Sequence, residues 1–557
     1  MSDPSGTIPV MRIAVAPGPD GTAWLSTVDG QPRFVADLAA EVRAAHPDTR
    51  WIWPDTAACY PALLAAGARV ARCHDLALIE GLLSGHDGHW GEPRSLAAAV
   101  ARLDGRPVPA DPEPVTHDPR LQPALFDHAP PAERSTMDDV LRVHAAQQKR
   151  IAEIGDRGAF ATLCALESAG ALIAAEMSHT GLPWRADVHR ALLAELMGTP
   201  LAPGMPPRRL TELAAEISAA FGGRPIHPDL PAEVIKAFAA AGIRLPSTRS
   251  WVLKEIDHPA VKPLLAYKEL YRIHTAHGQA WLDTWVHNGR FRAEYVVGGV
   301  VSGRWATRGG AALQIPRVIR RAVVADPDWV LVVADAGQLE PRILAALSGD
   351  RRLGEVAAAG DLYAALAAEA FDGDRDRAKL GLLGVLYGQT SGQAGQLLPV
   401  LRQRFPAAID YVERAAVAGE QGLLVRSGLG RTCPSPSASW WSQTGVDPGA
   451  VSVTRDGAGA ARSRGRFTRN FVVQASAAEW ALVVLAELRR ALHEGGLGEL
   501  VFFQHDEFIV HCPAAQADAV TAAVHAAAER AGDLLYPGVP VRFPMSVATS
   551  ASYADAK

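Results

Sequence analysis

The chain has 557 residues, of which 48% are hydrophobic and 21% charged, and its formal net charge is −5. This length allows several domains with sizeable cores, and the composition is that of an ordinary globular protein. The total charge does not by itself indicate nucleic-acid binding. We expect neither a signal peptide nor a membrane partner, because the N-terminus lacks a basic segment before a long apolar run, and no uncharged apolar run is long enough to span a bilayer. The five cysteines include no CxxC pair, which favours reduced thiols in a cytoplasmic protein over a disulfide framework or zinc ribbon.

The first hundred residues alternate between short strand-like and Ala-rich helix-like segments. "MRIAVAPG" and "RWIWPD" are typical of strands, whereas "VADLAAEVRAAH" and "DLALIEGLLSG" are typical of helices. This alternation predicts an α/β domain. Residues 105–135 are rich in Pro and lack periodicity, so we expect a linker there.

The middle of the chain is predicted to be mainly helical. Helical patterns cover Met137 to about Leu196 and then 209–287, and the segment "GRFRAEYVVGGVVSGRWAT" is typical of β structure. A strand that ends at Asp335 and a helical block to about Glu420 follow.

The last part of the chain begins with a Gly/Ser/Pro-rich stretch to about Arg466. "FTRNFVVQASAAEWALVVLAELRRAL" then predicts a helix, and "ELVFFQHDEFIVHC" predicts a hairpin.

Two acidic positions stand out because strand-like runs deliver them. In "LVVADAGQLEPRILAALSGD" an apolar strand ends at Asp335, where a carboxylate is costly unless it is paired or caps the next helix. In "VFFQHDEFIVHC" the acids Asp506 and Glu507 lie among bulky β-formers without Gly or Asn. Since side chains alternate along a strand, only one of these two acids can face the same site as Asp335 in regular geometry. Two such carboxylates suit two Mg²⁺ ions that hold the attacking and leaving oxygens of a phosphoryl transfer.

A basic helix is predicted between these acids. Arg375, Lys379, Leu383 and Tyr387 are spaced by four residues, so they share one helical face. An ordinary amphipathic helix with an extended lysine is one interpretation. The other is a cradle in which the cations meet a triphosphate and the apolar residues meet a base or sugar.

Arginines cluster on both sides of these motifs. Seven arginines and one acid lie between Arg290 and Arg321, and five arginines and one acid lie between Arg455 and Arg469. Arginine forms planar bidentate hydrogen bonds with phosphate, so the clusters suit a nucleic-acid backbone. A solvated Arg-rich surface is the alternative.

Five motifs in order resemble the DNA polymerase I family, the family-A DNA polymerases. They are "SGRWATRGGAALQIPRVIRRA", "DAGQLEPR", "RDRAKLGLLGVLYG", "RFTRNFVVQASAAE" and "QHDE", and "LPST" extends the likeness into the family's thumb. The resemblance implies an α/β exonuclease-like (RNase H-like) domain followed by an α+β right-hand polymerase fold of thumb, palm and fingers. The implied boundaries are 1–135 for the exonuclease-like domain, 136–300 for a helical connector and thumb, 301–345 and 466–557 for the palm, and 346–465 for the fingers.

The resemblance also implies roles for the matched residues. Asp335 and Asp506 would bind two Mg²⁺ ions, with Mn²⁺ as a substitute, Glu507 would lie near the primer terminus, and Lys379 would donate a proton to pyrophosphate. The implied nucleotide-binding residues are Arg375, Lys379, Leu383, Tyr387, Glu340, Gln338 and Tyr363. The implied DNA-binding residues are Arg304, Arg320, Arg466, Asn470, Gln474 and His505. Primer–template DNA and dNTPs are the implied partners of a monomer.

The chain departs from the family pattern at several positions. Leu383 replaces an aromatic residue, Ala336 a tyrosine, Tyr363 a histidine and Glu479 an aspartate. These changes leave the metal ligands and the basic helix intact.

The N-terminal domain departs further. Its first strand has no DxE, and Gln147 and Gln148 stand where the third exonuclease motif would place acids. We therefore expect an inactive exonuclease-like domain. The alternatives are a bifunctional polymerase with residual 3′-5′ exonuclease, a catalytically weak DNA-binding protein, and a single-subunit RNA polymerase, against which Glu340 argues.

Overall fold

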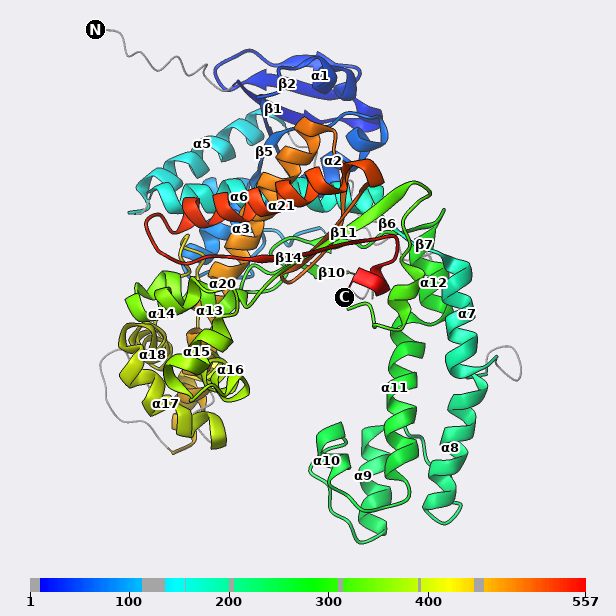
Figure 1. Ribbon diagram of the computed structural model, residues 1–557. Coiled ribbons are helices and arrows are strands. Elements are labelled where there is room, and N and C mark those ends of the chain that lie inside the picture. Colours follow the sequence, from blue (N-terminus) through cyan, green and yellow to red (C-terminus); the bar gives the residue numbers. More distant parts are fainter. Residues whose placement is uncertain are drawn as a thin grey trace.

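The computed structural model describes residues 11–112, 136–155, 157–199, 205–308, 314–388, 392–444 and 455–556. An α/β domain, drawn in blue and cyan at the top of Figure 1, rests on a central antiparallel sheet. Two helical arms extend from that sheet on the side opposite the α/β domain. This is the predicted arrangement of an N-terminal domain above a palm with fingers and thumb.

The N-terminal domain is built on a mixed five-stranded sheet with the order β3-β2-β1-β4-β5. Strands β1, β4 and β5 run parallel, whereas β2 and β3 are antiparallel additions at one edge. The strands are β1 (Arg12–Pro17), β2 (Ala23–Thr27), β3 (Arg33–Val35), β4 (Arg50–Trp53) and β5 (Arg72–Asp75). The helices are η1 (Pro19–Gly21), α1 (Leu38–Ala44), α2 (Thr56–Ala65), α3 (Leu76–His86) and α4 (Leu96–Leu103). The predicted alternation of strands and helices is confirmed.

Two long helices join this domain to the rest of the chain. Helix α5 (Met137–Glu153) begins with a capping box between Thr136 and Asp139 and packs on the first sheet beside β1. Helix α6 (Arg157–Thr180) lies between the N-terminal sheet and the central sheet. Both sheets therefore share packing partners and form one continuous body.

The thumb is the arm drawn in green and teal on the right of Figure 1. Its helices are α7 (Ala186–Met197), α8 (Arg208–Ala220), α9 (Pro231–Ala240), α10 (Ser250–Lys254), α11 (Val261–His277) and α12 (Gln279–Trp285). At its base lie the short strands β6 (Leu182–Pro183), β7 (Val286–His287), β8 (Arg290–Phe291), β9 (Tyr295–Val296) and β10 (Ala306–Thr307), followed by η2 (Ile319–Ala322). Lys268 donates to the carbonyl and hydroxyl of Thr248, which ties the "LPST" turn to α11.

The palm is a four-stranded antiparallel sheet with the order β12-β13-β11-β14. Its strands are β11 (Trp329–Ala336), β12 (Glu499–Gln504), β13 (Glu507–Pro513) and β14 (Met545–Ser550), with η3 (Ala514–Gln516), α21 (Ala517–Leu535) and η4 (Tyr553–Ala556) completing this part of the chain. Val332 and Ala334 belong to one apolar cluster, and Leu331 and Val333 to another. The apolar run in β11 is continuous because both faces of the sheet are buried.

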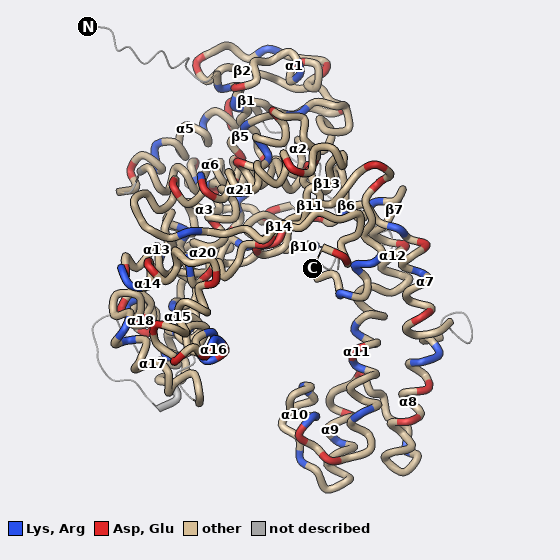
Figure 2. The backbone as a smooth tube through the Cα atoms, in the orientation of Figure 1, with Lys and Arg blue, Asp and Glu red and all other residues tan. Residues whose placement is uncertain are grey.

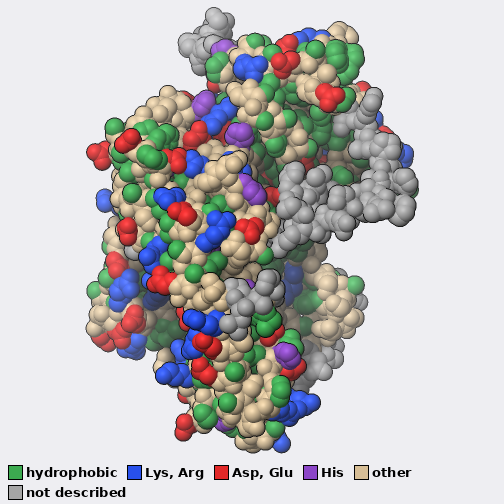
Figure 3. Space-filling model, turned by 90° about the vertical axis from the view of Figure 1, so that its right-hand side faces the viewer, with side chains coloured by type: hydrophobic (Ala, Val, Ile, Leu, Met, Phe, Trp, Pro, Cys, Tyr) green, Lys and Arg blue, Asp and Glu red, His purple; other side chains and the backbone are tan. Residues whose placement is uncertain are grey.

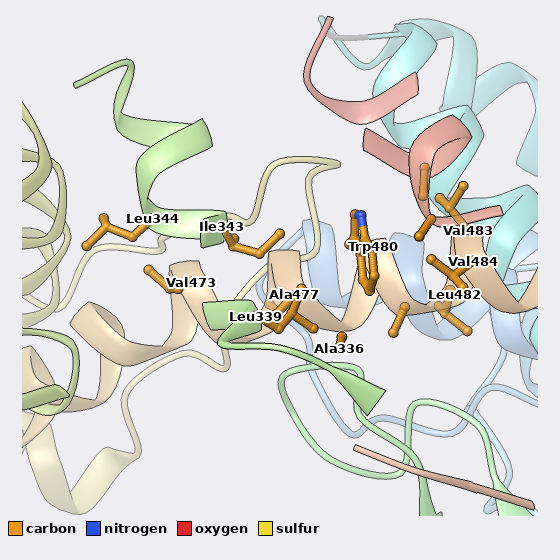
Figure 4. Packing of buried hydrophobic residues seen from close by; sticks show 14 of the residues in the cluster. Ala336, Leu339, Ile343, Leu344, Val473, Ala477, Trp480, Leu482, Val483 and Val484 are labelled. Carbon is orange, nitrogen blue, oxygen red and sulfur yellow. The ribbon is translucent and has the colours of Figure 1, made fainter. Parts of the chain in front are cut away.

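The fingers form the second arm and are linked to the palm by a buried contact between two helices. The finger helices are α13 (Leu339–Ser348), α14 (Arg351–Ala357), α15 (Leu362–Ala370), α16 (Arg375–Tyr387), α17 (Gly392–Arg404), α18 (Pro406–Glu420) and α19 (Ala438–Thr444). Leu339 and Ile343 of α13 lie against Val473, Ala477 and Trp480 of the long helix α20 (Arg455–Gly495), as Figure 4 shows. The helix that follows Asp335 is therefore held in place by the core.

The helix predicted from Phe467 onward begins earlier in the structure, since α20 starts at Arg455. Gly457, Gly459 and Gly465 fall in this first part of α20 and lower its helix propensity by about 1 kcal/mol each. Packing against α18 overrides this preference. A Cβ at Gly465 would lie 2.7 Å from Cγ of Glu420, so the glycine permits a close approach of the two helices.

Within the described residues, two helices are long and apolar enough to cross a membrane by length and composition, Gly158–Thr180 and Gly457–Gly495. Their apolar windows are 61% and 78% buried inside the protein, as is usual for core helices. On the face in Figure 3, acidic and basic side chains are interspersed. All five cysteines are buried and free, as the sequence predicts.

The α18–α20 contact gives a stability prediction. Gly419→Ala would place a Cβ against Oγ1 of buried Thr468 and 2.8 Å from its Cγ2. Overpacking of this kind costs about 1–3 kcal/mol, more than the ~1 kcal/mol that alanine gains over glycine in a helix. We expect a lower thermal unfolding midpoint.

Gly459→Ala is the matched control, because nothing lies within 4 Å of its Cβ position. Its midpoint should stay level or rise. Equal decreases in the two variants would contradict the close-packing argument.

Candidate active site

The pairing of β11 with β13 brings three acids to one end of the palm sheet. Asp335 is the register partner of Glu507, and the backbone N–H of Ala336 donates to the carbonyl of Asp506 at 3.0 Å. Gln504 pairs with Glu507, so His505 and Asp506 form the hairpin turn. His505 adopts φ of +58°, a left-handed conformation that a non-glycine residue adopts at some cost. The predicted meeting of the first and second acidic motifs is therefore present.

Asp506 is electrostatically primed to receive a cation. Burial raises the pKa of its carboxyl to about 6, and the nearby charge of Asp335 acts in the same direction. Arg304 opposes this shift only in part. Two crowded carboxylates repel each other, and a divalent ion between them would relieve that repulsion.

The oxygen donors present fit magnesium. Mg²⁺ prefers oxygen and is commonly held by one or two carboxylates together with water and substrate phosphates. Among the residues that the structure describes, no group of three or more His, Cys, Asp or Glu side chains is placed to hold a metal ion. Asp335 and Asp506 would therefore leave most coordination positions to water and phosphate.

A pocket opens beside Asp506, and Glu340 is one of the residues that line it. The hydroxyl of Tyr387 donates to Oε2 of Glu340 at 2.9 Å, and Arg304 donates to Oε1. These bonds fix the carboxylate in the pocket wall. The lining residues are Arg304, Leu339, Glu340, Pro341, Tyr363, Leu383, Tyr387, Ala477, Ala478, His505 and Asp506.

Helix α16 forms the finger side of the site and carries the predicted basic face. Asp374 caps its first turn, and Lys and Arg gather on the helix in Figure 2. Lys379 is exposed and makes no hydrogen bond or ion pair with any residue the structure describes. It is thus available to an anionic ligand. Leu383 and Tyr387, one and two turns later, reach the pocket.

Arg375 is engaged within the protein. Its Nε donates to Asp361 at 2.9 Å, and its guanidinium lies 5.7 Å from the ring centroid of Tyr363. Burial alone would raise the pKa of Asp361, but the hydrogen bonds from Arg375 and Gln338 lower it to about 2. A triphosphate would have to compete with this carboxylate for Arg375.

Gln338 does not line the pocket and instead ties α13 to α15. It adopts φ of +58°, its amide nitrogen donates to Asp361 at 2.8 Å, and its amide oxygen accepts from the N–H of Leu362 at 2.8 Å. Because the Gln338 amide is hydrogen-bonded to Asp361 and Leu362, it is not placed for its predicted contact with a nucleotide.

Arg342 has a role that sequence reasoning missed. It is fully buried, and its guanidinium donates to the carbonyls of Gly337, Ala357, Ala359, Gly360 and Arg542. It satisfies backbone groups just before α13 begins and where α14 ends.

Glu507 is held by a residue near the end of the chain that no motif identified. The hydroxyl of Tyr553 donates to Oε1 of Glu507, and the guanidinium of Arg320 lies 4.2 Å from the centroid of the Tyr553 ring. Arg320, predicted to bind DNA, therefore supports a tyrosine that positions an acid.

The other predicted DNA-binding residues divide between the pocket and α20. Arg304 and His505 line the pocket. Arg466 is exposed on α20, where a Cβ at Gly388 would lie 2.7 Å from its Cγ. Gly388 ends α16 with φ of +66°, so glycine serves there for both conformation and close approach.

Asn470 and Gln474 follow on α20 and are half-buried. Oδ1 of Asn470 is buried and lacks a hydrogen-bond partner among the described residues.

In the N-terminal domain the acids near the sheet are used as helix caps. Asp55 accepts from the backbone of α2, and buried Asp75 accepts from the N–H groups of Thr56 and Leu78. Burial raises the pKa of Asp75 to about 6, and Asp55 adds to that shift. Oε1 of Gln147 lies 3.0 Å from Nε2 of His74, and its amide nitrogen donates to the carbonyl of Leu76 and to the carboxylate of Glu80.

The chain is similar to known proteins in sequence and in fold. Residues 233–554 match the family model described as DNA polymerase family A. The chain belongs to this family. The match begins in the thumb, as the "LPST" turn predicts, and includes every palm and finger motif.

Similar proteins include DNA polymerase I of Chloroflexus aurantiacus, 29% identical over 293 residues, which are 47% of this chain and 29% of that protein. The thermostable DNA polymerase I of Thermus thermophilus is 28% identical over 321 residues, 52% of this chain and 36% of that protein. The matched part thus spans about a third of the length of these relatives.

A solved structure described as the POL domain of Pol1 from M. smegmatis in complex with DNA primer-template and dNTP has a TM-score of 0.74 to this chain. It covers 98% of this chain and 96% of its own, with 20% identity. The likeness confirms the predicted fold, an α/β domain followed by a polymerase right hand.

The support of Glu507 gives a prediction. Tyr553→Phe removes the hydroxyl that donates to this carboxylate, and a hydrogen bond to a charged group contributes about 1.5–3 kcal/mol. We expect a lower midpoint in thermal unfolding of the full chain.

Tyr295→Phe is the control, since its hydroxyl only accepts from the N–H of Phe503 at 3.3 Å. Its midpoint should fall less. A loss as large as that of Tyr553→Phe would count against the charge-assisted bond.

Proposed function

We propose that the protein is a DNA-templated DNA polymerase that extends a primer 3′ end with dNTPs by two-metal nucleotidyl transfer. The observation that carries this proposal is the placement of Asp335 and Asp506 at one end of the palm sheet, beside a pocket whose other wall is the basic helix α16. The M. smegmatis protein, which has the same fold, was solved with primer–template and dNTP, and this supports the same ligands here.

The carboxylates and the basic helix have complementary tasks in this proposal. Magnesium ions bound by Asp335 and Asp506 would supply positive charge at the attacking and leaving oxygens. Lys379 neutralises the departing pyrophosphate and donates a proton to it, which its exposure permits. Arg375 exchanges Asp361 for the triphosphate as the nucleotide enters. Glu507, held by Tyr553, orients the primer terminus.

Glu340 selects the sugar. Its carboxylate is held by Tyr387 and Arg304 in the pocket wall, so it cannot swing away from a 2′ hydroxyl without loss of both bonds. A ribonucleotide polymerase would need this space open, which argues against the RNA polymerase alternative. A DNA-binding protein without catalysis would have no need for two crowded carboxylates at a pocket that helix α16 also lines.

In the cell we propose a role in repair or gap filling without proofreading. The N-terminal acids Asp55 and Asp75 are occupied as caps, and Gln147 supplies a neutral amide that is already hydrogen-bonded to His74 and Glu80. Residual exonuclease is the alternative, and primer degradation tests it directly.

Metal-dependent synthesis is the first functional prediction. Asp335→Ala and Asp506→Ala should each reduce primer extension by several orders of magnitude while duplex binding stays within a few fold, because the acids act on the reacting phosphate as one unit. Single-turnover extension with Mg²⁺ measures the rate. Asp533→Ala, an exposed palm acid on α21, is the control and should extend at the wild-type rate. Near wild-type extension by either active-site variant would refute the metal assignment.

The second functional prediction concerns discrimination between ribonucleotides and deoxyribonucleotides. Glu340→Ala opens the space for a 2′ hydroxyl and should raise the ratio of ribonucleotide to deoxyribonucleotide incorporation at least tenfold, because exclusion by clash disappears. Tyr387→Phe keeps the ring but removes one bond to Glu340, so its effect should be smaller. An unchanged ratio in Glu340→Ala would assign discrimination to another residue.

The third functional prediction concerns proofreading. A labelled, mismatched primer incubated without nucleotides should keep its length with Mg²⁺ or Mn²⁺, since two-metal hydrolysis needs converging carboxylates. Asp335→Ala separates the two sites, because it removes only polymerase activity. Shortening from the 3′ end that persists in Asp335→Ala and disappears in Asp55→Asn would establish a live exonuclease.

A further inference from the structure

Three arginines stand side by side across the parallel strands of the N-terminal sheet. Arg12 is the register partner of Arg50, and Arg50 is the register partner of Arg72. Register partners project from the same face, and neighbouring strands are about 4.8 Å apart. Like charges directly opposite one another destabilise a sheet, so this row costs free energy in the isolated protein.

Few acidic groups of the protein neutralise the positive charge of these three arginines. Arg72 has an ion pair with Asp48 at 3.8 Å, and both side chains are about half exposed or more, so the pair contributes little. The guanidinium groups of Arg12 and Arg50 make no hydrogen bond or ion pair with any residue in the described part of the chain. Nε of Arg50 is buried and has no acceptor there. Burial lowers the pKa of Arg50, and the charges of Arg72 and Arg12 lower it further.

Two histidines lie on this face, and the carboxylate of Glu80, which is linked to His74 through Gln147, is already paired with Arg102 and Arg150. His74 and His144 pack edge to face with ring centroids 4.8 Å apart. Burial lowers the pKa of His74 to about 3 and that of His144 to about 4, and Arg50 and Arg12 contribute to both shifts. The histidines are therefore neutral. The guanidinium groups of the row keep N–H donors and positive charge with which an anion could pair.

An exposed aromatic pair lies on the same face. Ala16 is the register partner of Trp24, and Trp24 is the register partner of Phe34. Arg12 and Ala16 are four residues apart on β1, so they share a face and are about 13 Å apart along the strand. Trp24 and Phe34 are 48% and 56% exposed, and their ring centroids are 5.7 Å apart.

Helix α5 covers the middle of this face and leaves its margins open. Ala14 and Ile52 are buried in a cluster with Val140 and Val143 of α5. The aromatic pair remains at the β2–β3 edge, and the arginines remain at the N-terminal ends of the parallel strands. We call these five residues, Arg12, Arg50, Arg72, Trp24 and Phe34, the arginine–aromatic face.

The arginine–aromatic face is separate from the polymerase site. Figure 1 shows the N-terminal sheet on the side of the palm opposite the thumb and finger arms. The arginine row also lies at the strand ends opposite to Asp75, which ends β5. DNA held between thumb and fingers would not reach it.

We propose that the arginine–aromatic face binds single-stranded nucleic acid, with the arginines on phosphates and the aromatic rings stacked on bases. Basic side chains that hold phosphates and exposed aromatic side chains that stack on bases are the usual composition of such surfaces, and a single strand several nucleotides long can span the distance of about 13 Å along β1 between the two margins of this face. The guanidinium row meets successive phosphates, and Trp24 and Phe34 meet bases of the same strand. This binding needs no metal and does not depend on catalysis.

The test uses the full chain with its polymerase site filled. An excess of unlabelled hairpin primer–template occupies that site, and fluorescence anisotropy then follows a labelled twelve-residue oligothymidine. We expect the Arg12→Gln/Arg72→Gln variant to bind at least tenfold more weakly than wild type. Its salt slope should fall by about 1.4, because two phosphate contacts are lost at about 0.7 each.

Arg43→Gln, an exposed arginine on α1 that donates to the carbonyl of Ala66, is the control and should bind as wild type. Thermal unfolding checks the fold, and loss of like-charge repulsion predicts no decrease in midpoint for the double variant. Should the double variant unfold, exposed Arg12→Gln alone provides the same test with half the slope change.

Base stacking is tested with an abasic strand of equal length. Trp24→Ala should weaken oligothymidine binding about tenfold and leave abasic binding unchanged. The proposal is overturned if wild type does not bind oligothymidine once the hairpin is present, or if the double variant binds with wild-type affinity and slope. It is also overturned if polyglutamate displaces the oligonucleotide at equal charge concentration, which would indicate an acidic protein partner.

Discussion

The pairing of β11 with β13 is the constraint on which the rest of the structure depends. It sets Asp335 opposite Glu507 and brings the backbone of Asp506 into contact with Ala336. A slip of one residue would turn every side chain of β11 to the other face of the sheet. Val332 and Ala334 pack in one buried cluster and Leu331 and Val333 in the other, so such a slip would place each pair in a core shaped for the other, and the packing of the two cores fixes the register. The acids are crowded as a result, and the charge of Asp335 adds to the rise in the pKa of Asp506 that burial causes.

A buried ion pair supports the loop that brings Arg304 to the pocket. Arg431 and Glu167 pair at 2.7 Å in the interior, and a Cβ at Gly303 would lie 2.6 Å from Cζ of Arg431. Gly303 has φ of +82°, so glycine is required there on both counts. The loop that delivers Arg304 to Glu340 is thus seated on a buried ion pair. Removal of one partner of such a pair leaves an uncompensated charge, so this support is stiff.

The N-terminal domain is an α/β domain in which several acids hydrogen-bond the backbone at helix starts. Asp55, Asp75 and Asp139 each accept hydrogen bonds from the first turn of a helix. Glu176, buried beneath this domain, pairs with Arg489 at 2.7 Å and accepts from Tyr60 at 2.6 Å. These contacts bind α6 and α20 to the first sheet and make the domain a rigid base for the palm. The uncompensated positive charge of this domain lies instead in the row formed by Arg12, Arg50 and Arg72.

The sequence by itself determined the elements whose signals are local. The apolar run of β11, the hairpin around Asp506 and the four-residue spacing from Arg375 to Tyr387 are periodic patterns, and periodicity reports secondary structure directly. Tertiary structure alone decided which distant residues meet. Tyr553 and Glu507 lie 46 positions apart, and Arg12, Arg50 and Arg72 become neighbours only through the strand order β1-β4-β5. Likewise, α20 extends back to Arg455 because packing against α18 outweighs the cost of its glycines, and the engagement of Gln338 with Asp361 depends on where α15 docks. Contacts of this kind arise from packing between segments remote in the chain, and no local pattern of residues encodes them.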